Sequence, residues 1–506
     1  MMAGVHTRYR FSLGALLQDL LAVPEEADRP VTGLCADSRE VMPGDLFVAR
    51  RGLTVDGARF IDAAIARGAV AALWEPEPGV EPVPLSWRHP ESGTPVPVLA
   101  MPGLGAQLGE IADRFYANPS RALEIAGITG TNGKTSVSHF LAQALAAEAP
   151  WGVLGTLGCG LVGDLAPTGH TTPDVIRVHR ALAELRESGA AGVAMEVSSH
   201  ALDQHRVDQV RFDYAVFTNL SRDHLDYHGD MARYAEAKGR LFRWPELRGA
   251  VLNADDAVGR ELASQLPAGV QPLTYGLDPA QAPDLLARDI MLAPEGLQAT
   301  VLTPEGEGTL RAPLLGRFNV ANLLAALGVL LLRGTPLPTA LERLASVTPV
   351  PGRMERFGGG DRPTVVVDYA HTPDALAQVL AALREHHPGN LICVFGCGGD
   401  RDPGKRPLMG GVAERLADRV ILTDDNPRSE APDAIRAAIL EGMRDPRAVL
   451  NIPDRARAIA EAVALAGPDD IVLVAGKGHE DWQILAAGRI PFSDTDEVRR
   501  ALEAWT

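Results

Sequence analysis

The stretch that decides the fold is Gly127-Ile-Thr-Gly-Thr-Asn-Gly-Lys-Thr-Ser136. It follows an apolar run, residues 123–127, and precedes a helix-like segment, residues 137–145. Glycines in such a strand–turn–helix unit let backbone N–H groups converge on phosphate oxygens, and the helix N-terminus adds partial positive charge. Ile stands at 128, where the G-x-x-x-x-G-K-[ST] pattern needs glycine, but Gly-Lys-Thr is intact. The stretch therefore predicts nucleotide binding, with Lys134 on the outer phosphates and Thr135 on Mg²⁺.

Length and charge restrict the classes to which the chain can belong. Its 506 residues, 46% of them apolar, predict about three domains that each bury a core. The formal charge of −17 argues against nucleic acid or an anionic membrane as a partner, because either would need a basic face. The cysteines lack paired spacing and are expected to be buried thiols in a reducing compartment: Cys35, Cys159, Cys393 and Cys397. Since the sequence shows no signal peptide or membrane-spanning run, we expect a cytoplasmic protein without membrane insertion.

Lysine is scarce in this chain. Of 48 basic residues only four are lysine: Lys134, Lys238, Lys405 and Lys477. Arginine therefore supplies the ordinary surface charge. A position that keeps lysine is a candidate for chemistry that the planar, permanently charged guanidinium does not provide. Chance retention is the alternative, but each of the four lies in a dense motif of polar residues and glycines, which favours function.

Residues 1–104 carry no nucleotide motif and predict a small α/β module. Turn signals separate three expected strands and one helix: strands 46–49, 70–74 and 96–100, and helix 61–68. The proline-rich residues 76–97 are expected to form a surface loop. In Ala36-Asp-Ser-Arg39, Ser38 and Arg39 either contact an anion or cap a turn, and the residues alone favour the turn.

In the central region, residues 105–348, two expected buried strands end in polar groups. The strand 192–197 delivers Glu196, and the strand 214–218 is followed by Asp223 and His224. Active groups gather at the carboxyl ends of parallel strands in an open α/β sheet. Each residue alone would more often be a capped loop residue, but two strand ends beside one phosphate loop favour a Mg²⁺ site.

Two helices of the central region add further candidates. Lys238 lies in an amphipathic helix with Tyr234, and a single helical lysine is usually solvated. Asn319 and Asn322 are one helical turn apart at the start of a long apolar helix, so they share a face. They either cap the helix or contact a purine.

Residues 349–506 alternate strands and helices. Continuous β-branched runs predict a buried parallel sheet of the doubly wound type: residues 364–368, 390–395, 419–423 and 470–475. Each run ends in a polar motif at the crevice edge of such a sheet: Tyr369-Ala-His371, Gly396-Cys-Gly-Gly-Asp-Arg-Asp402, Asp424-Asp-Asn-Pro-Arg428 and Gly476-Lys-Gly-His-Glu480. Four such motifs in series indicate a ligand site.

Five motifs together resemble those of the Mur ligase family: Thr129–Thr135, Met195–His200, Asn219–His228, Asp368–Pro373 and Gly476–Glu480. The resemblance covers nearly the whole chain. It implies an α/β protein of three domains: a small UDP-binding N-terminal module (1–104), a central P-loop ATPase-type domain (105–348) and a C-terminal Rossmann-like doubly wound sheet that binds an amino acid (349–506). Among Mur ligases, the chain most resembles those that add the third peptide residue.

The resemblance implies a role for each matching residue. ATP would be bound by Gly130, Thr131, Asn132, Gly133, Lys134, Thr135, Ser136, Asn319, Arg353 and Asp368. The UDP-N-acetylmuramoyl-dipeptide would be bound by Ala36, Ser38, His170, Thr171, Thr172, Ser198, Gln204 and Arg206, so that Ser38 is reassigned from the turn to the ligand. The incoming amino acid would be bound by Arg401, Asp425, Asn426, Pro427, Arg428, Gly476 and Glu480.

The resemblance also implies a catalytic set and a metal. The catalytic residues would be Lys134, Glu196, His224 and Lys238, and Mg²⁺ would be held by Thr135, Glu196, His224 and Lys238. Lys238 would carry a carbamate derived from CO₂. A neutral primary amine can add CO₂, which arginine cannot do.

The implied activity is that of an ATP-dependent amide ligase in peptidoglycan precursor synthesis. The D-glutamyl carboxylate would take the γ-phosphoryl group of ATP, and a free diamino acid would then attack the acyl phosphate. meso-Diaminopimelate is favoured over L-ornithine and L-lysine, because Arg428 and Arg401 can pair with its distal carboxylate and Glu480 with its distal ammonium. We expect a monomer.

Two remoter alternatives belong to other classes. A folate-polyglutamating ligase shares the ATPase chemistry but does not explain the N-terminal module. A non-catalytic, nucleotide-gated binding protein would not need the intact catalytic set of Lys134, Glu196, His224 and Lys238.

Overall fold

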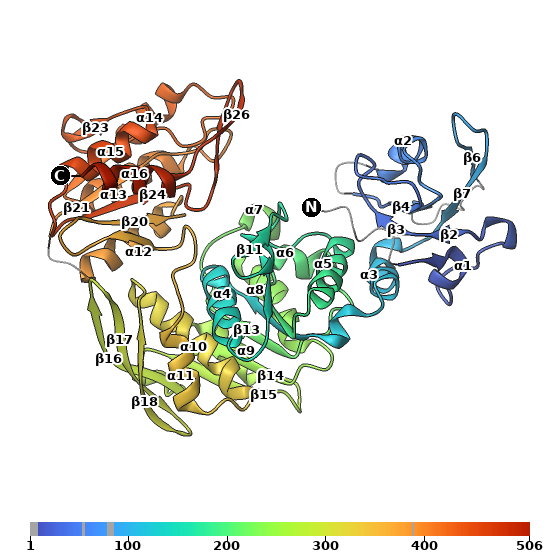
Figure 1. The fold of residues 1–506 in the computed structure, drawn as a ribbon, viewed down its shortest axis with the longest axis horizontal. Coiled ribbons are helices and arrows are strands. Elements are labelled where there is room, and N and C mark those ends of the chain that lie inside the picture. Colours follow the sequence, from blue (N-terminus) through green and yellow to red (C-terminus); the bar gives the residue numbers. More distant parts are fainter. Residues whose placement is uncertain (1–8, 53–55, 78–84, 387–388, 506) are drawn as a thin grey trace. The chain divides into compact units, whose positions relative to one another are not determined.

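A computed structural model describes residues 9–52, 56–77, 85–386 and 389–505 of the chain (Figure 1). Its internal packing divides the chain into two compact units. The first is Met1–Ser138 with Leu145–Pro272, and the second is His139–Ala144 with Leu273–Thr506. The three-domain boundaries at residues 104 and 348 stay a prediction.

The N-terminal part of the first unit is a five-stranded sheet in the order β3-β4-β5-β7-β6. Its strands are β3 (Gly33–Cys35), β4 (Asp45–Ala49), β5 (Ala71–Trp74), β6 (Leu85–Arg88) and β7 (Pro95–Ala100), and β6 is the antiparallel one. A two-stranded pair and three helices accompany it: β1 (Phe11–Ser12), β2 (Pro30–Val31), α1 (Leu13–Leu16), α2 (Ile61–Ala66) and α3 (Leu104–Phe115). The α/β module expected from the sequence is confirmed.

The expected surface loop over residues 76–97 is wrong in its second half. Residues 85–88 form β6, which pairs antiparallel with β7 so that Trp87 lies opposite Val96. The Trp87 indole also donates a hydrogen bond to the Asp62 carboxylate on α2. Cross-strand pairing of a large aromatic with a β-branched residue stabilises the edge strand despite the surrounding prolines. Residues 78–84 of the expected loop lie outside the described part of the chain.

The rest of the first unit is built on seven neighbouring strands of an eleven-stranded sheet, in the order β11-β10-β9-β12-β8-β13-β14. Its parallel strands are β8 (Glu124–Thr129), β9 (Trp151–Gly155), β12 (Gly192–Glu196), β13 (Tyr214–Phe217) and β14 (Gly249–Asn253), with β10 (Gly158–Leu161) and β11 (Asp164–Ala166) as antiparallel edge strands. The helices are α4 (Lys134–Leu145), α5 (Val175–Glu187), α6 (Ser199–Asp203), α7 (Leu225–His228), α8 (Met231–Gly239) and α9 (Ala257–Ser264). Because β8 lies between β12 and β13, the ends of these three strands meet at one edge.

The second unit begins with an antiparallel ribbon, β16 to β18. Its elements are β15 (Gln271–Gly276), β16 (Leu285–Ala293), β17 (Gly296–Thr303), β18 (Gly306–Ala312), α10 (Arg317–Leu332) and α11 (Leu337–Ala345). Helix α10 is buried around most of its circumference, which is typical of an apolar helix inside a core. Just before it, Leu315 packs into the C-terminal core, and His386 accepts a 2.7 Å hydrogen bond from the Gly316 N–H. These contacts join the ribbon to the C-terminal sheet within one unit.

The C-terminal sheet has the order β19-β20-β24-β21-β22-β23. Its strands are β19 (Glu355–Gly358), β20 (Thr364–Asp368), β21 (Leu391–Phe395), β22 (Arg419–Leu422), β23 (Leu450–Asn451) and β24 (Ile471–Ala475), and β19 is the antiparallel edge. The other elements are α12 (Pro373–His386), α13 (Lys405–Leu416), α14 (Pro432–Leu440), α15 (Arg455–Leu465), α16 (Asp494–Ala504) and the hairpin β25 (Trp482–Leu485)–β26 (Gly488–Pro491). Alternate strand residues enter two separate cores, one with α12–α14 and one with α15 and α16. The doubly wound parallel sheet is therefore confirmed.

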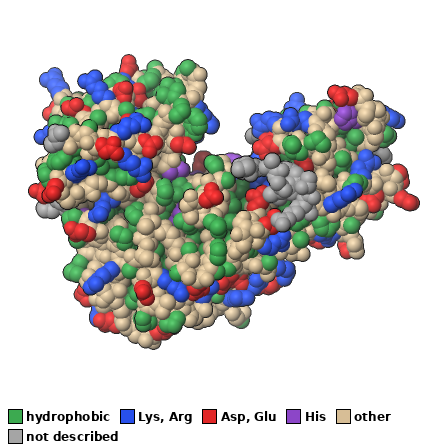
Figure 2. Space-filling view, viewed as in Figure 1, with side chains coloured by type: hydrophobic (Ala, Val, Ile, Leu, Met, Phe, Trp, Pro, Cys, Tyr) green, Lys and Arg blue, Asp and Glu red, His purple; other side chains and the backbone are tan. Residues whose placement is uncertain are grey.

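The structure also shows the state of the cysteines, the character of the helices and the distribution of surface charge. All four cysteines are free thiols, and Cys35, Cys393 and Cys397 are buried. Within the described ranges, no helix has the length and apolar character needed to cross a membrane. Acidic and basic side chains are interspersed over the visible face (Figure 2).

Candidate active site

The phosphate loop connects β8 to α4, and two of its three glycines have a geometric reason. Gly130 and Gly133 adopt φ of 144° and 88°, the left-handed region that favours glycine. A Cβ on Gly130 would stand 1.8 Å from the Thr218 hydroxyl oxygen. Gly127, by contrast, lies inside β8, where a Cβ would stand 2.9 Å from the Phe212 ring. Gly127 therefore serves the packing of β8 and is not part of the phosphate-binding loop, which explains why it does not fall at a glycine position of the G-x-x-x-x-G-K-[ST] pattern.

We expect Gly130→Ala to abolish most nucleotide binding and to lower the free energy of unfolding by about 1–3 kcal/mol, from backbone strain and overpacking. The Cβ would collide with the Thr218 hydroxyl at a φ that alanine rarely adopts. Nucleotide affinity by calorimetry and a urea unfolding curve measure the two effects. Gly163→Ala is the matched control, since Gly163 has φ of 95° but no heavy atom within 4 Å of a Cβ. Equal effects in both variants would contradict the steric explanation.

The tip of the loop is held by the residues that follow β13. The Asn132 N–H donates to Asn219 Oδ1 at 3.0 Å, and the Thr218 hydroxyl donates to the Asn132 carbonyl at 2.6 Å. The Thr131 N–H donates to the Asn219 carbonyl at 2.8 Å. The two strand ends expected beside the loop therefore do lie against it. The ordered loop backbone is what a phosphate cradle requires.

Both lysines of the first unit reach the same loop carbonyl. Lys134 Nζ donates to the carbonyls of Gly130 at 2.9 Å and Thr131 at 3.0 Å. Lys238 Nζ donates to the Gly130 carbonyl at 2.8 Å and lies 4.5 Å from the centre of the Tyr234 ring. Burial lowers the pKa of Lys238 well below its usual value, and the neighbouring positive charge of Lys134 adds to the effect. A helical lysine that looked solvated from its sequence is thus 1% exposed.

Glu196 is buried at the end of β12 and meets the phosphate loop. Its Oε2 accepts from the Thr135 hydroxyl at 3.0 Å and from the Thr156 hydroxyl at 3.1 Å. Its Oε1 accepts from the Thr156 N–H at 2.8 Å. A hydroxyl and a carboxylate in contact are hard oxygen donors of the kind that Mg²⁺ prefers. The predicted metal residues Thr135 and Glu196 are therefore together.

In the part of the chain that the structure describes, His224 makes no hydrogen bond to Thr135 or Glu196, and its backbone N–H donates to the Asp223 carboxylate. Its φ is 53°, its side chain is about half exposed, and its ring packs edge-on against His200 with centroids 4.9 Å apart. Burial, followed by the charge of His224, lowers the pKa of His200 to about 4, so His200 is neutral near pH 7. Among the described residues there is no group of three or more His, Cys, Asp or Glu side chains placed to hold a metal.

The residues predicted for the muramoyl substrate lie next to Glu196. The Thr172 hydroxyl donates to the Glu196 carbonyl at 2.8 Å, and Arg206 Nη1 donates to the Thr172 carbonyl at 2.9 Å. Arg206 also donates to the Gln204 amide oxygen at 2.6 Å, and the hydroxyls of Thr171 and Thr156 are 3.0 Å apart. These contacts gather threonine hydroxyls and one arginine around the end of β12.

Within the described part of the chain, the other four predicted substrate residues make no hydrogen bond to Glu196 or Arg206: Ala36, Ser38, His170 and Ser198. Ser198 caps α6 by accepting from the Ala201 N–H at 3.1 Å, and His170 is exposed. Ala36 and Ser38 lie in the turn after β3, where the Asp37 carboxylate accepts from the Arg39 N–H at 2.9 Å. The turn is therefore stabilised by Asp37, so Ser38 is not the turn-capping residue.

Asn319, Arg353 and Asp368 belong to the second unit. Asn319 is 3% exposed, and its amide donates to the Leu315 carbonyl at 2.7 Å and accepts from Asn322 at 2.9 Å. Asp368 accepts from the N–H groups of Met354 and Ala370, each at 2.8 Å. Its burial raises its pKa above the usual value. The Arg353 guanidinium lies 4.6 Å from the centre of the Tyr369 ring, and its buried Nε has no hydrogen-bond partner among the described residues.

The predicted amino-acid residues gather at the carboxyl ends of β22 and β24. Asn426 Nδ2 donates to Glu480 Oε2 at 2.7 Å, and a Cβ on Gly476 would stand 2.7 Å from Asp425 Oδ2. Arg428 has φ of 54°, and its Nη1 donates to the Gly399 carbonyl at 2.7 Å. A non-glycine residue held in the left-handed region is strained, and such strain is common at ligand sites. Arg401 is exposed, and its described hydrogen bond is to the Asp400 carbonyl at 3.2 Å.

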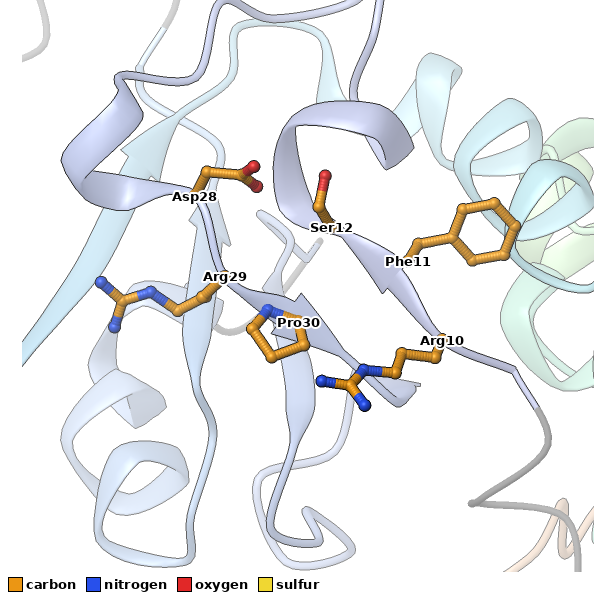
Figure 3. Close-up of a pocket in the computed structure, with 6 residues that line it drawn as sticks. All are labelled: Arg10, Phe11, Ser12, Asp28, Arg29 and Pro30. Atoms are coloured by element: carbon orange, nitrogen blue, oxygen red, sulfur yellow. The ribbon is translucent and has the colours of Figure 1, made fainter.

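A separate shallow pocket in the first unit takes no part in these contacts. It is lined by Arg10, Phe11, Ser12, Asp28, Arg29 and Pro30 (Figure 3). The Arg29 guanidinium already donates to four backbone carbonyls, and the Asp28 carboxylate accepts from the Gly14 N–H at 2.8 Å. The charged groups of Arg29 and Asp28 are therefore occupied by structural contacts.

Some residues of the site have no sequence motif that marks them. Thr156 follows the apolar strand β9 and contacts Glu196 through both its N–H and its hydroxyl. Only the prediction that β9 also ends at the active edge of the sheet could have drawn attention to it. Tyr234 could have been found more directly, because residues i and i+4 share a helix face and Lys238 is four residues further on.

A phosphate loop joined to a buried carboxylate is the arrangement of an enzyme that acts on a nucleoside triphosphate with Mg²⁺. Residues 30–116 match the Mur ligase family, catalytic domain; residues 128–330 match the Mur ligase middle domain; and residues 352–478 match the Mur ligase, glutamate ligase domain. The chain belongs to the Mur ligase family.

Similar proteins cover nearly the full length. A UDP-N-acetylmuramoyl-L-alanyl-D-glutamate–2,6-diaminopimelate ligase of Pseudomonas aeruginosa is 52% identical over 481 residues, 95% of this chain and 96% of that protein. The protein of the same name from Coxiella burnetii is 48% identical over 97% of this chain and 100% of that protein. A solved structure with that name has a TM-score of 0.70 and 37% identity, and covers 98% of this chain and 99% of its own. A folylpolyglutamate synthase of Mycobacterium tuberculosis, at 21% identity and a TM-score of 0.59, covers 72% of this chain and shares the fold.

Proposed function

We propose that this Mur ligase joins 2,6-diaminopimelate to the D-glutamate of UDP-N-acetylmuramoyl-L-alanyl-D-glutamate, with ATP as the phosphoryl donor. The observation that carries the proposal is the position of Glu196. Its side chain contacts Thr135 of the phosphate loop, while its carbonyl accepts from Thr172, next to Arg206. A phosphoryl donor and an anionic acceptor can therefore meet at one strand end. The relatives of about half-identical sequence bear the name of this activity.

The reaction needs two anions to approach each other. In the first step, the D-glutamyl carboxylate attacks the γ-phosphorus of ATP, which gives an acyl phosphate and ADP. Lys134 and the N–H groups of the loop orient the phosphates, and Arg206 orients the muramoyl substrate. Thr135 and Glu196, with His224 and modified Lys238, would hold Mg²⁺, which neutralises phosphate charge when it is bound.

In the second step, the deprotonated amine of the amino acid attacks the acyl carbon. A tetrahedral intermediate forms, phosphate leaves, and an amide remains. Arg428 and Arg401 would pair with the distal carboxylate of diaminopimelate, and Glu480 with its distal ammonium. L-Lysine and L-ornithine lack that carboxylate, so they are the weaker candidates for the substrate.

We further propose that Lys238 carries a carbamate. The fit lies in its surroundings, because burial lowers the pKa of Lys238 and so favours the neutral amine that adds CO₂. The modification would replace a positive charge by a negative one beside Lys134 and the phosphate loop. The local electrostatic potential would then favour a bound cation such as Mg²⁺. We also propose that the protein acts as a monomer in the cytoplasm.

The remaining assignments follow the family. Ala36 and Ser38 would contact the uridine nucleotide, and Asn319, Arg353 and Asp368 the adenosine of ATP. The buried, partnerless Nε of Arg353 supports the last group, because such an atom calls for a hydrogen-bond acceptor.

The test is a ligation assay with UDP-N-acetylmuramoyl-L-alanyl-D-glutamate, ATP and Mg²⁺. Diaminopimelate, L-lysine and L-ornithine are supplied in turn, and phosphate release and product mass are measured. We expect the highest kcat/KM with diaminopimelate, by at least about 100-fold, from the two arginine contacts. Hydroxylamine added without amino acid should trap the acyl phosphate as a hydroxamate. Phosphate release without any hydroxamate would contradict the acyl-phosphate route, and faster ligation of lysine would overturn the substrate assignment.

A further inference from the structure

The strongest unexplained group in the C-terminal domain is the ammonium of Lys477. The residue follows β24, and its side chain is 0% exposed. Nζ lies 2.9 Å from Glu480 Oε2, 3.2 Å from Asn426 Oδ1 and 2.5 Å from the Trp482 carbonyl. An ammonium has three N–H donors, and all three acceptors are supplied. A buried charge with every donor matched is a built feature of the fold, since an incomplete set would be costly.

Two of the three acceptors are close to Lys477 in the chain, and the third is distant. Glu480 lies in the same loop after β24, and Trp482 begins the hairpin strand β25 that follows this loop. Asn426 belongs to the segment after β22, fifty-one residues away. Asn426 Oδ1 also accepts from the Ile484 N–H at 2.9 Å, and the Arg428 N–H donates to the Ile484 carbonyl at 2.9 Å. Lys477 therefore lies where the predicted amino-acid residues are tied to the hairpin.

The geometry explains why lysine persists at this position in a chain that otherwise uses arginine. Three acceptors around one nitrogen suit a compact ammonium at the end of an unbranched stem. A guanidinium is planar and spreads its five N–H donors over three nitrogens. None of these nitrogens carries three N–H groups, so arginine cannot serve three acceptors from one nitrogen. The scarcity of lysine and the contacts of Nζ are independent observations that agree.

The contacts of Lys477 fall on one side of the Glu480 carboxylate. Oε2 accepts from both Lys477 Nζ and Asn426 Nδ2. Among the described residues, none donates a hydrogen bond to Oε1, and the side chain is 33% exposed. One oxygen of Glu480 is thus fixed by protein contacts, and the other is left for a cationic group from outside.

We propose that Lys477 is a positioning residue of the amino-acid site, an inference that rests on the proposed function. It fixes the Glu480 carboxylate and the Asn426 amide so that Glu480 Oε1 receives the distal ammonium of the diamino acid. Lys477 itself does not touch the substrate. Without the Lys477 ammonium, the Glu480 side chain would be free to rotate. Binding of the diamino acid would then have to fix this side chain, and the entropy cost would lower the affinity.

The test is a double-mutant cycle on Lys477 and Glu480. We expect Lys477→Met to raise the KM for diaminopimelate about 10- to 100-fold, as for a lost charged hydrogen bond, while the KM values for ATP and the muramoyl substrate stay within about twofold. Lys477→Arg should not restore the affinity. Because Lys477 acts through Glu480, the double variant Lys477→Met/Glu480→Gln should bind diaminopimelate no more weakly than Glu480→Gln alone. Arg457→Met, which removes an exposed cation of the same domain, is the control and should change none of the three KM values.

Two outcomes would overturn the inference. Additive effects in the double variant would show that Lys477 does not act through Glu480, and a parallel rise in all three KM values would indicate a role in folding alone. If Lys477→Met does not fold, Lys477→Gln, which keeps one donor, is judged by the same criteria. Equilibrium binding of diaminopimelate to each variant gives a readout without turnover. Unchanged affinity would reject the role of Lys477, whereas wild-type protein that binds but forms no amide would reject the proposed function instead.

Discussion

Replacing Lys238 with alanine is expected to lower kcat about 100- to 1,000-fold, the size of effect that follows loss of one preorganised electrostatic group. The KM for diaminopimelate should change little, because Lys238 lies at the phosphate loop. The fold should persist, since the Gly130 carbonyl that Lys238 contacts also accepts from Lys134. Steady-state kinetics and a thermal unfolding curve measure both expectations.

The proposed carbamate adds two expectations that loss of a lysine alone would not give: rescue by a small carboxylate and uptake of bicarbonate. A small carboxylate such as acetate can occupy the space vacated in Lys238→Ala and should restore part of the activity. Wild-type protein should take up labelled bicarbonate, and the variant should not. Arg233→Ala removes a 78% exposed cation from the same helix and should leave kcat unchanged. Full activity of Lys238→Ala, with no response to acetate, would reject the carbamate.

The packing around Lys238 shows why the lysine can hold a neutral amine. Tyr234 is 1% exposed and covers Nζ with its ring, while its hydroxyl lies 3.2 Å from the Thr131 hydroxyl. Burial also raises the pKa of Tyr234 to about 12, so the phenol stays neutral beside the loop. Burial of Nζ, together with the positive charge of Lys134, outweighs the attraction of the ammonium to the ring and lowers the pKa of Lys238.

The phosphate loop and the sheets could be predicted because their signals are local. Continuous apolar runs specify β8, β20 and β24, and Gly-Lys-Thr specifies the turn that follows β8. The resemblance to Mur ligases rested on the same motifs and is confirmed by the family matches. The reason for each glycine could not be predicted, since it depends on the backbone conformation and on a distant neighbour: Gly127 lies in a strand against the Phe212 ring, and Gly130 has a positive φ against the Thr218 hydroxyl.

Features that depend on distant contacts were beyond the sequence. The strand β6 lies among prolines, and its pairing with β7 is visible only in three dimensions. Thr156 belongs to no sequence motif, because its partner, Glu196 at the end of β12, lies forty residues further along the chain. Lysine scarcity drew attention to Lys477, and two of its acceptors follow it closely in the chain, but the third, Asn426, is brought to it only by the fold. The individual site roles, the metal set and the carbamate stay predictions.

Replacing Arg428 with methionine is expected to lower kcat/KM for diaminopimelate about 30- to 5,000-fold, which corresponds to the cost of roughly 2–5 kcal/mol for removing one partner of a desolvated charge pair. The kcat/KM for L-lysine, which lacks the distal carboxylate, should change less than about threefold, so the variant should discriminate poorly between the two. Methionine keeps the length of the aliphatic stem, so the packing beside Gly398 and Gly399 is largely retained. The ligation assay with both amino acids measures the ratio directly.

The backbone of Arg428 gives this prediction its physical basis. A left-handed φ of 54° is strained for arginine, and it is maintained by the hydrogen bond from the Arg428 N–H to the Ile484 carbonyl and by the contact of Nη1 with Gly399. If the arginine served only stability, methionine would relieve no strain, would lose the Gly399 contact, and would lower kcat/KM for both amino acids alike. Arg447→Met, an exposed cation of the same domain, controls for net charge. A loss confined to diaminopimelate therefore assigns the guanidinium to the distal carboxylate, and an equal loss for lysine rejects that assignment.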